Sequence, residues 1–228
     1  MKSVLIKLLI GLSVLMNIAV AYIVIGLANG QLPEFMLKVM VEPNYQRWVS
    51  QFDVLPVQPG DVVFLGDSIT EGGAWHELFP DTAVRNRGIG GDTTSGVLAR
   101  LHQVSAGKPS KVLLLIGTND MAIGRSDETI IENILTIIDR LKTESPETQV
   151  ILQSILPRSD GYQARIESLN DKLRTAAEGR ALWVDVYSGM LAEDGAISDR
   201  YSNDELHLYG EAYKLWADTI ADHVTAEE

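Results

Sequence analysis

The chain has 228 residues, of which 46% are apolar and 22% charged, so its size and composition fit one globular domain with a sizeable core. It has no cysteine, which excludes disulfide bonds, a cysteine nucleophile and zinc–thiolate sites. The formal net charge is −12, and a surface this acidic repels polyanions and argues against a nucleic-acid partner.

The N-terminal segment is apolar enough to enter a membrane. No side chain from Leu8 to Ala28 is charged, and a run of this length can cross a bilayer as a helix. Lys2 and Lys7 precede the run, which favours an N-terminus in the cytoplasm and the rest of the chain outside it. We therefore expect residues 1–30 to be an uncleaved anchor. The alternative is a secreted protein whose signal peptide is cleaved after Ala19-Val20-Ala21, but the apolar run continues past that site.

Residues 31–60 are expected to connect this anchor to a domain that covers residues 61–228. Prolines punctuate the connector at positions 33, 43, 56 and 59. A short helix is expected near Tyr45–Phe52. Tyr45 and Trp48 are expected to pack against the edge of the domain.

From Asp61 onward the pattern alternates between strands and helices. Apolar runs predict buried strands at Val62–Leu65 and Val112–Ile116, and further strands are expected at Ala83–Asn86, Val150–Leu152 and Leu182–Val186. Helices with an apolar stripe are expected to begin at Thr93 or Thr94, at Ser126, before Ile166 and at about Gly210. This alternation predicts an α/β fold, a three-layer α/β/α sandwich with a central parallel sheet of about five strands.

The first of four polar segments is Gly66–Thr70, directly after the predicted strand Val62–Leu65. A serine at the carboxyl end of a buried strand lies at the sheet edge where open α/β folds bind ligands, so Ser68 is a candidate nucleophile. The alternative is that Ser68 only caps the next helix. The segment is not the nucleophile elbow of α/β-hydrolases, which needs glycine two residues after the serine, where this chain has Thr70.

Two further segments offer hydrogen-bond donors. Asn86–Thr93 is rich in glycine, so its backbone N–H groups can approach an oxyanion or a phosphate, although an ordinary turn with a helix cap has the same pattern. Its glycine spacing does not fit a dinucleotide fingerprint. Gly117–Asp120 follows the strand Val112–Ile116, and the Asn119 amide can donate two hydrogen bonds without carrying a charge. An Asx-turn is the structural alternative for Asn119.

The fourth segment, Asp204–His207, pairs an acid with a histidine. A spacing of three residues places Asp204 and His207 on one side of a turn. The acid can then orient the imidazole while the other ring nitrogen reaches a serine. The remaining histidines are expected to be structural or solvated: His76, His102 and His223.

Together, these four segments resemble the motifs of the GDSL or SGNH esterase and lipase family, in the family's order and at its spacing. The resemblance spans Asp61 to roughly Ile220 and leaves residues 1–60 outside it. Ile69 stands where the family name has leucine, which is a frequent variation. Asn86–Thr93 and Asp204–Gly210 look especially like the platelet-activating-factor acetylhydrolase branch and related bacterial acyl esterases.

This resemblance implies a flavodoxin-like SGNH fold and a serine hydrolase that needs no metal or organic cofactor. Ser68 would attack an ester carbonyl, His207 would take its proton, and Asp204 would orient the imidazole. The backbone N–H groups of Ser68 and Gly91 and the side chain of Asn119 would form the oxyanion hole. The implied substrates are carboxylic esters with short acyl groups on small molecules, glycans or lipids.

Two other functions stay open at this point. A thioesterase or lysophospholipase would use the same three groups on a different substrate. A membrane-tethered binding module that has lost catalysis belongs to another class of function. The filled positions of all four motifs argue against that module.

Overall fold

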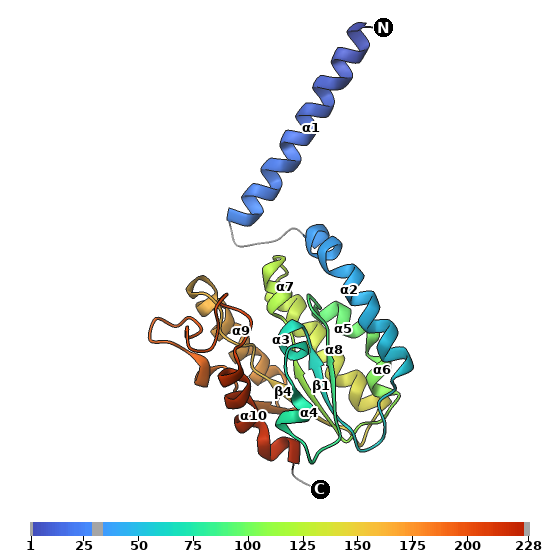
Figure 1. The fold of residues 1–228 in the computed structure, drawn as a ribbon, viewed down its shortest axis with the longest axis vertical. Helices are drawn as coiled ribbons and strands as arrows, with labels where there is room; N and C mark the ends of the chain where they lie inside the picture. The colour runs from blue at the N-terminus through green and yellow to red at the C-terminus, as the bar shows by residue number, and fades with distance from the viewer. Residues whose placement is uncertain (1, 29–33, 226–228) are drawn as a thin grey trace.

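The computed structural model describes residues 2–28 and 34–225 of the chain. Its core is one parallel sheet of five strands in the order β2-β1-β3-β4-β5 (Figure 1). The strands are β1 (Val62–Gly66), β2 (Val84–Gly88), β3 (Lys111–Leu115), β4 (Gln149–Gln153) and β5 (Leu182–Val184). These positions confirm the five predicted strands, and no strand end differs from its prediction by more than two residues.

Helices cover both faces of the sheet, which confirms the three-layer prediction. In β1, Val63 and Leu65 pack on one face while Val62 and Phe64 pack on the other, and all four are buried. The first face is covered by α5 (Thr94–Arg100), α6 (His102–Ser105), α8 (Asp127–Glu144) and α9 (Gln163–Ala176). The second is covered by α4 (Trp75–Leu78) and α10 (Gly210–Thr225). Burial on both faces explains why β1 and β3 have unbroken apolar sequences.

Short elements connect the layers near the carboxyl ends of the strands. They are α3 (Ser68–Glu71), α7 (Thr118–Ala122) and the 3₁₀ turns η1 (Asp160–Tyr162) and η2 (Ser188–Met190). Thr93 caps α5 by accepting the Gly96 N–H at 3.2 Å, and Ser126 caps α8 by accepting the Thr129 N–H at 3.3 Å. Both caps are those that the sequence predicts.

The order of the strands fixes where a site can form. The chain passes from β1 to β2 on one side and then returns to place β3 on the other side of β1. The connections leaving β1 and β3 therefore diverge to opposite faces and open a crevice at the carboxyl ends of these strands. Three of the four polar segments follow β1, β2 and β3, so the fold gathers them at this crevice.

Helix α2 (Glu34–Val54) is longer than the predicted helix at Tyr45–Phe52 and continues through Pro43. Pro43 is exposed, so its ring faces solvent and its missing N–H removes one hydrogen bond within the helix. Packing outweighs this loss, because Phe52 is only 4% exposed and α2 lies along α5 and α6 (Figure 1). Gln103 of α6 also donates to the Val49 carbonyl at 3.0 Å. These contacts are distant in sequence, so the local proline pattern does not reveal them.

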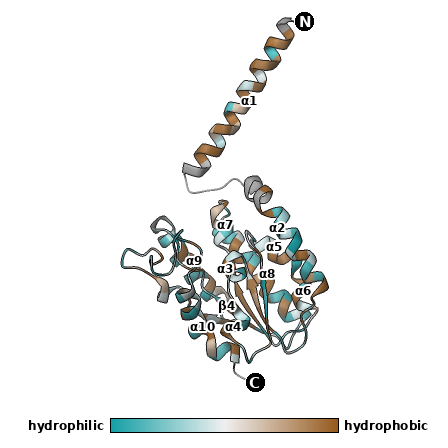
Figure 2. Cartoon of the chain, viewed as in Figure 1, coloured by the Kyte–Doolittle hydropathy of each residue, from teal (hydrophilic) through white to brown (hydrophobic). Residues whose placement is uncertain are grey.

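The N-terminal helix α1 (Lys2–Ala28) is long and apolar enough to be a membrane span or a signal sequence. Its segment Val4–Ile25 has a mean hydropathy of 2.5, and none of it is buried against the rest of the structure. Figure 2 shows this helix as predominantly hydrophobic along its length. At 1.5 Å per residue, 22 residues extend about 33 Å, which matches the hydrocarbon thickness of a bilayer.

Candidate active site

Ser68 is the first residue of α3, immediately beyond the end of β1. Asp67 precedes it and caps the helix, with Oδ1 accepting the Ile69 N–H at 3.0 Å. The turn requires Gly66, because a Cβ there would lie 2.3 Å from the Leu115 carbonyl oxygen. Tyr213 of α10 donates to the Ile69 carbonyl at 2.8 Å and so ties α3 to the C-terminal helix. Ser68 is therefore held half-buried at the sheet edge, at the place that the sequence predicts.

The structure joins Ser68, His207 and Asp204 in one chain of hydrogen bonds. Ser68 Oγ lies 3.0 Å from His207 Nε2, and His207 Nδ1 lies 2.7 Å from Asp204 Oδ2. Asp204 Oδ1 also accepts the backbone N–H of His207 at 2.7 Å. One carboxylate thus fixes both the ring and the backbone of the histidine.

The segment that carries Asp204 and His207 is a tight loop before α10. Glu205 has a φ of 61°, in the left-handed region that few residues other than glycine adopt. This turn lets Asp204 and His207 face each other across a spacing of three residues. Ser202 Oγ accepts the Leu206 N–H at 3.1 Å, and this bond ties the start of the loop to the residue before His207.

Hydrogen bonds within the loop lower the pKa of Asp204. Partial burial raises the pKa, but the hydrogen bonds from the ring and the backbone of His207 outweigh burial and lower it to about 2. Asp204 is therefore ionised near neutral pH, and its charge faces Nδ1. A negative group at this position stabilises a protonated imidazole.

The glycine-rich loop after β2 lies beside Ser68. A Cβ built on Gly90 would be 3.9 Å from Ser68 Cβ. Gly91 has a φ of 76°, and a Cβ there would lie 2.5 Å from Val41 Cγ1 of α2, so the position needs glycine for both reasons. Within residues 34–225, no acceptor pairs with the Gly91 N–H.

Asn119 of α7 lies against the same loop. Its Nδ2 donates to the Asp92 carbonyl at 2.9 Å, which fixes the plane of the amide. The neighbouring Asp120 accepts both the N–H and the hydroxyl of Thr94, at 2.9 and 2.7 Å. The segments after β2 and β3 are thus bonded to each other, and one N–H of Asn119 is left for another acceptor.

Buried charges support the loops without reaching the serine. Asp92 and Arg100 form an ion pair at 2.8 Å in which both side chains are almost fully buried. Arg100 also donates to the carbonyls of Gly66 and Arg87, at 3.1 and 2.9 Å. The carboxyl of Asp67 is fully buried, and this burial raises its pKa to about 7. Asp67 and Asp92 order their turns by accepting the N–H groups of Ile69 and Thr93, and the role of Arg100 is one that the sequence analysis missed.

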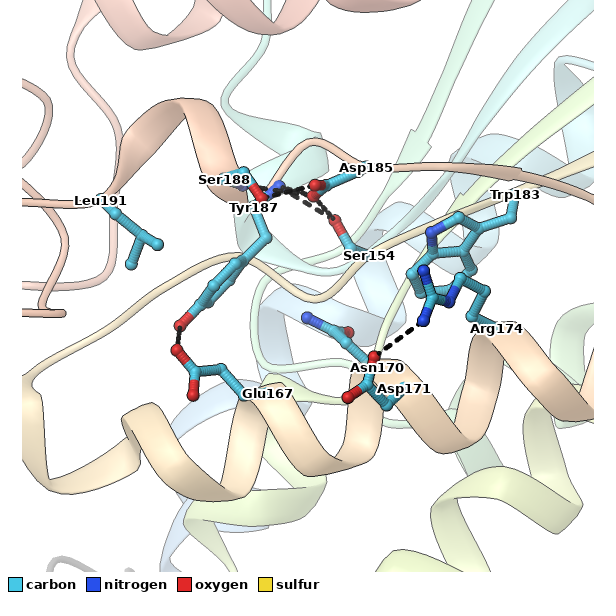
Figure 3. Close-up of a pocket in the computed structure, with 10 residues that line it drawn as sticks. All are labelled: Ser154, Glu167, Asn170, Asp171, Arg174, Trp183, Asp185, Tyr187, Ser188 and Leu191. Atoms are coloured by element: carbon cyan, nitrogen blue, oxygen red, sulfur yellow. Dashed lines mark hydrogen bonds and ion pairs between the residues drawn. The ribbon is translucent and has the colours of Figure 1, made fainter.

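A separate cavity of about 410 Å³ lies between α9 and the edge strand β5 (Figure 3). It contains none of the residues proposed from the sequence. Its polar groups already bond to one another: Asp185 accepts Ser154 Oγ at 3.2 Å and Ser188 Oγ at 2.5 Å, and Glu167 accepts the Tyr187 hydroxyl at 3.2 Å. These groups are satisfied, so we place the candidate active site at Ser68 rather than in this cavity.

Comparisons with known proteins identify the family of this chain. Residues 64–215 match the model of the GDSL-like lipase/acylhydrolase family. The chain belongs to this family. The alpha2 subunit of platelet-activating factor acetylhydrolase IB from Rattus norvegicus is 32% identical over 183 residues, which cover 73% of this chain and 79% of that protein. The alpha1 subunit from Bos taurus is also 32% identical, over 159 residues that cover 65% of this chain and 68% of that protein.

A solved structure gives the same result. The GDSL-like lipase from Bacteroides thetaiotaomicron superposes with a TM-score of 0.70 and 28% identity, over 79% of this chain and 97% of that one. These similarities confirm the predicted family and fold, and they make this chain a GDSL-family hydrolase. The family match begins at residue 64, so α2 lies outside it.

Proposed function

We propose that this GDSL hydrolase cleaves carboxylic esters with short acyl groups, through an acyl-enzyme on Ser68. The observation that carries the proposal is the continuous chain of hydrogen bonds from Ser68 through His207 to Asp204. A serine is a weak nucleophile until an adjacent base accepts its proton. Nε2 of His207 lies at hydrogen-bond distance for that transfer.

In the first half of the reaction, Ser68 Oγ attacks the ester carbonyl carbon while His207 takes the hydroxyl proton. The carbonyl π electrons move onto oxygen and form a tetrahedral oxyanion. The oxyanion then collapses, the bond to the alcohol breaks, and His207 gives its proton to the leaving oxygen. In the second half, His207 removes a proton from water as the water oxygen attacks the acyl carbon. The bond between the acyl carbon and Ser68 Oγ then breaks, His207 returns the proton to Oγ, and the acid is released. Asp204 stabilises the protonated imidazole in both halves.

Three donors would hold the oxyanion: the N–H groups of Ser68 and Gly91 and the side chain of Asn119. The Ser68 N–H has no acceptor within α3 because Ser68 is the first residue of that helix. The Gly91 N–H and one N–H of Asn119 complete the set. Removal of one such donor costs roughly 3 kcal/mol of transition-state stabilisation.

The site is open, which bears on the substrate. The side chain of His207 is 49% exposed, so the alcohol part of an ester can extend into solvent. A small molecule, a glycan or a lipid can therefore carry the acyl group. The relatives from Rattus norvegicus and Bos taurus are called acetylhydrolases, which supports a short acyl group.

We also propose that α1 stays in the membrane, with the N-terminus in the cytoplasm and the hydrolase domain outside. Its span of 22 residues and the position of Lys2 and Lys7 before the apolar run support this topology. Cleavage as a signal peptide would release the same enzyme from the cell.

The experiment that tests the esterase is the variant Ser68→Ala, assayed with p-nitrophenyl esters of increasing acyl length. We expect loss of nearly all turnover with an unchanged melting temperature, and loss of labelling by a fluorophosphonate probe. Ser95→Ala is the matched control, because Ser95 is an exposed serine on α5 and should keep full activity. Normal turnover by a folded Ser68→Ala protein would exclude the mechanism. A preference for long acyl chains or for thioesters would favour the lysophospholipase or thioesterase alternative.

A further inference from the structure

A single carboxylate connects α2 to the glycine loop. Glu71, the last residue of α3, accepts the indole N–H of Trp48 through Oε1 at 2.7 Å. Its other oxygen, Oε2, accepts the backbone N–H of Gly90 at 2.5 Å. Trp48 lies on α2, 23 residues before Glu71, and Gly90 lies 19 residues after it. The carboxylate therefore bridges three segments that meet beside Ser68.

We propose that Glu71 is the positioning residue of the oxyanion hole, and that Trp48 of α2 holds Glu71 in place. This inference rests on the proposed esterase function and adds to it a device that fixes the Gly91 N–H. It also makes α2, which lies outside the family match, a working part of the hydrolase.

The glycine loop needs such a restraint because of its composition. Gly90 and Gly91 are consecutive residues without Cβ atoms, so their backbone has many accessible conformations. An N–H that donates to a charged carboxylate forms a stronger bond than one that donates to a neutral oxygen. Fixing the Gly90 N–H limits the rotations that would turn the next peptide, which carries the Gly91 N–H, away from Ser68.

Helix α2 also contacts the glycine loop directly. The position of a Cβ on Gly91 would be 2.5 Å from Val41 Cγ1, and that of a Cβ on Gly90 would be 3.8 Å from Asn44 Nδ2. Val41, Asn44 and Trp48 are spaced at i, i+3 and i+7, so they share one face of α2. That face touches the loop at Val41 and holds Glu71 at Trp48.

The bridge acts through orientation rather than through its charge. A negative carboxylate close to an oxyanion would oppose it by simple electrostatics. Both oxygens of Glu71, however, are already engaged by N–H donors, Oε1 by Trp48 and Oε2 by Gly90. We therefore expect a neutral acceptor at this position to preserve catalysis, provided that it still accepts from Gly90.

The test uses the full-length protein in detergent, with kcat and KM measured for p-nitrophenyl acetate. Glu71→Ala removes both acceptors and should lower kcat by about tenfold to a hundredfold, less than the loss of a whole donor, with KM almost unchanged. The fluorophosphonate probe counts the active sites, so a lower kcat per labelled site is distinguished from partial unfolding.

A pair of further variants isolates the bridge. In Glu71→Gln, one side-chain oxygen remains, and the amide N–H₂ must face either Gly90 or Trp48, which are both donors. Adding Trp48→Phe removes one of these donors and leaves the side-chain oxygen free to accept from Gly90, so the kcat of Glu71→Gln/Trp48→Phe should be at least as high as that of Glu71→Gln. A purely structural role predicts the opposite, a lower kcat in the double variant, because the second change removes a further contact of α2.

Tyr45→Phe is the matched control on the same helix face. Its hydroxyl donates to the Gly96 carbonyl at 3.3 Å on α5, so the variant loses an α2 contact without touching the bridge. We expect an unchanged kcat. The positioning proposal is overturned if folded Glu71→Ala keeps the normal kcat per site, or if the double variant has a lower kcat per labelled site than Glu71→Gln. If Ser68→Ala keeps its activity, the esterase function itself fails instead.

Discussion

The variant Asp204→Asn tests the proton chemistry of the proposed esterase most directly. In the native loop, Asp204 Oδ1 accepts the backbone N–H groups of His207 and Leu206 at 2.7 and 3.0 Å, and Oδ2 faces His207 Nδ1 at 2.7 Å. An asparagine can keep both backbone bonds with its carbonyl oxygen. Its amide N–H₂ then faces Nδ1 and donates to it, so the ring proton moves to Nε2.

That change of tautomer has a large expected effect. Nε2 carrying a proton cannot accept one from Ser68 Oγ, 3.0 Å away. The geometry stays nearly constant, but the base is lost, and we expect kcat to fall by about 10⁴-fold, equivalent to roughly 5.5 kcal/mol of transition-state stabilisation. Fold stability should change little, because the side chain of Asp204 is 48% exposed and solvent screens its charge.

The assay measures kcat and KM with p-nitrophenyl acetate, alongside the melting temperature and the rate of fluorophosphonate labelling. We expect labelling to slow in parallel with kcat, since both reactions need the same nucleophile. Asp218→Asn, an exposed acid paired with Lys214 on α10, is the control and should be fully active. A folded Asp204→Asn protein within tenfold of normal kcat would refute the role of Asp204 in orienting the imidazole.

Three further outcomes are expected. Asn119→Ala should lower kcat by about 10²- to 10³-fold with little change in KM, as measured by steady-state kinetics. Burial raises the pKa of the Asp67 carboxyl from its usual 3.8 to about 7. The protonated carboxyl therefore stabilises the fold fully below pH 3.8, and this stabilisation is lost as the pH rises through 7. In urea titrations between pH 4 and 7, the free energy of unfolding of Asp67→Asn should therefore rise relative to that of the native protein. Deletion of residues 1–30 should give a soluble, active enzyme, recovered after ultracentrifugation, because α2 remains intact.

Local patterns were sufficient to predict most of the fold. The strand β1 could be predicted because each of its residues is buried, so no polar alternation interrupts the apolar run. Thr93 and Ser126 could be predicted as caps because a cap acts within three residues of itself. The extent of α2 could not be predicted, since its stability comes from residues such as Arg87 and Gln103 on other elements.

The candidate site also has parts that could be predicted from the sequence and parts that could not. Asp204 and His207 are three residues apart, so their pairing was predictable from spacing. The contact of His207 with Ser68 spans 139 residues, and the resemblance to a family was needed to predict it. Glu71 was missed because its partners lie on two distant segments, and no pattern marks a carboxylate that accepts two N–H groups. Arg100 left a weak signal, as a charged residue next to the apolar stripe of α5 and α6.

The position of α2 bears on where the functional unit begins. The apolar pattern and the family match place the start of the domain near residues 61–64, but the contacts of α2 extend the unit at least to Val41. An isolated helix that contains a proline is barely stable in water, so its packing must hold it. Burial of Phe52 contributes about 1.5–3 kcal/mol, and the guanidinium of Arg87 lies 4.6 Å above its ring. A deletion that extends through residue 55 would remove this packing together with Trp48. It should therefore lose activity that the deletion of residues 1–30 retains.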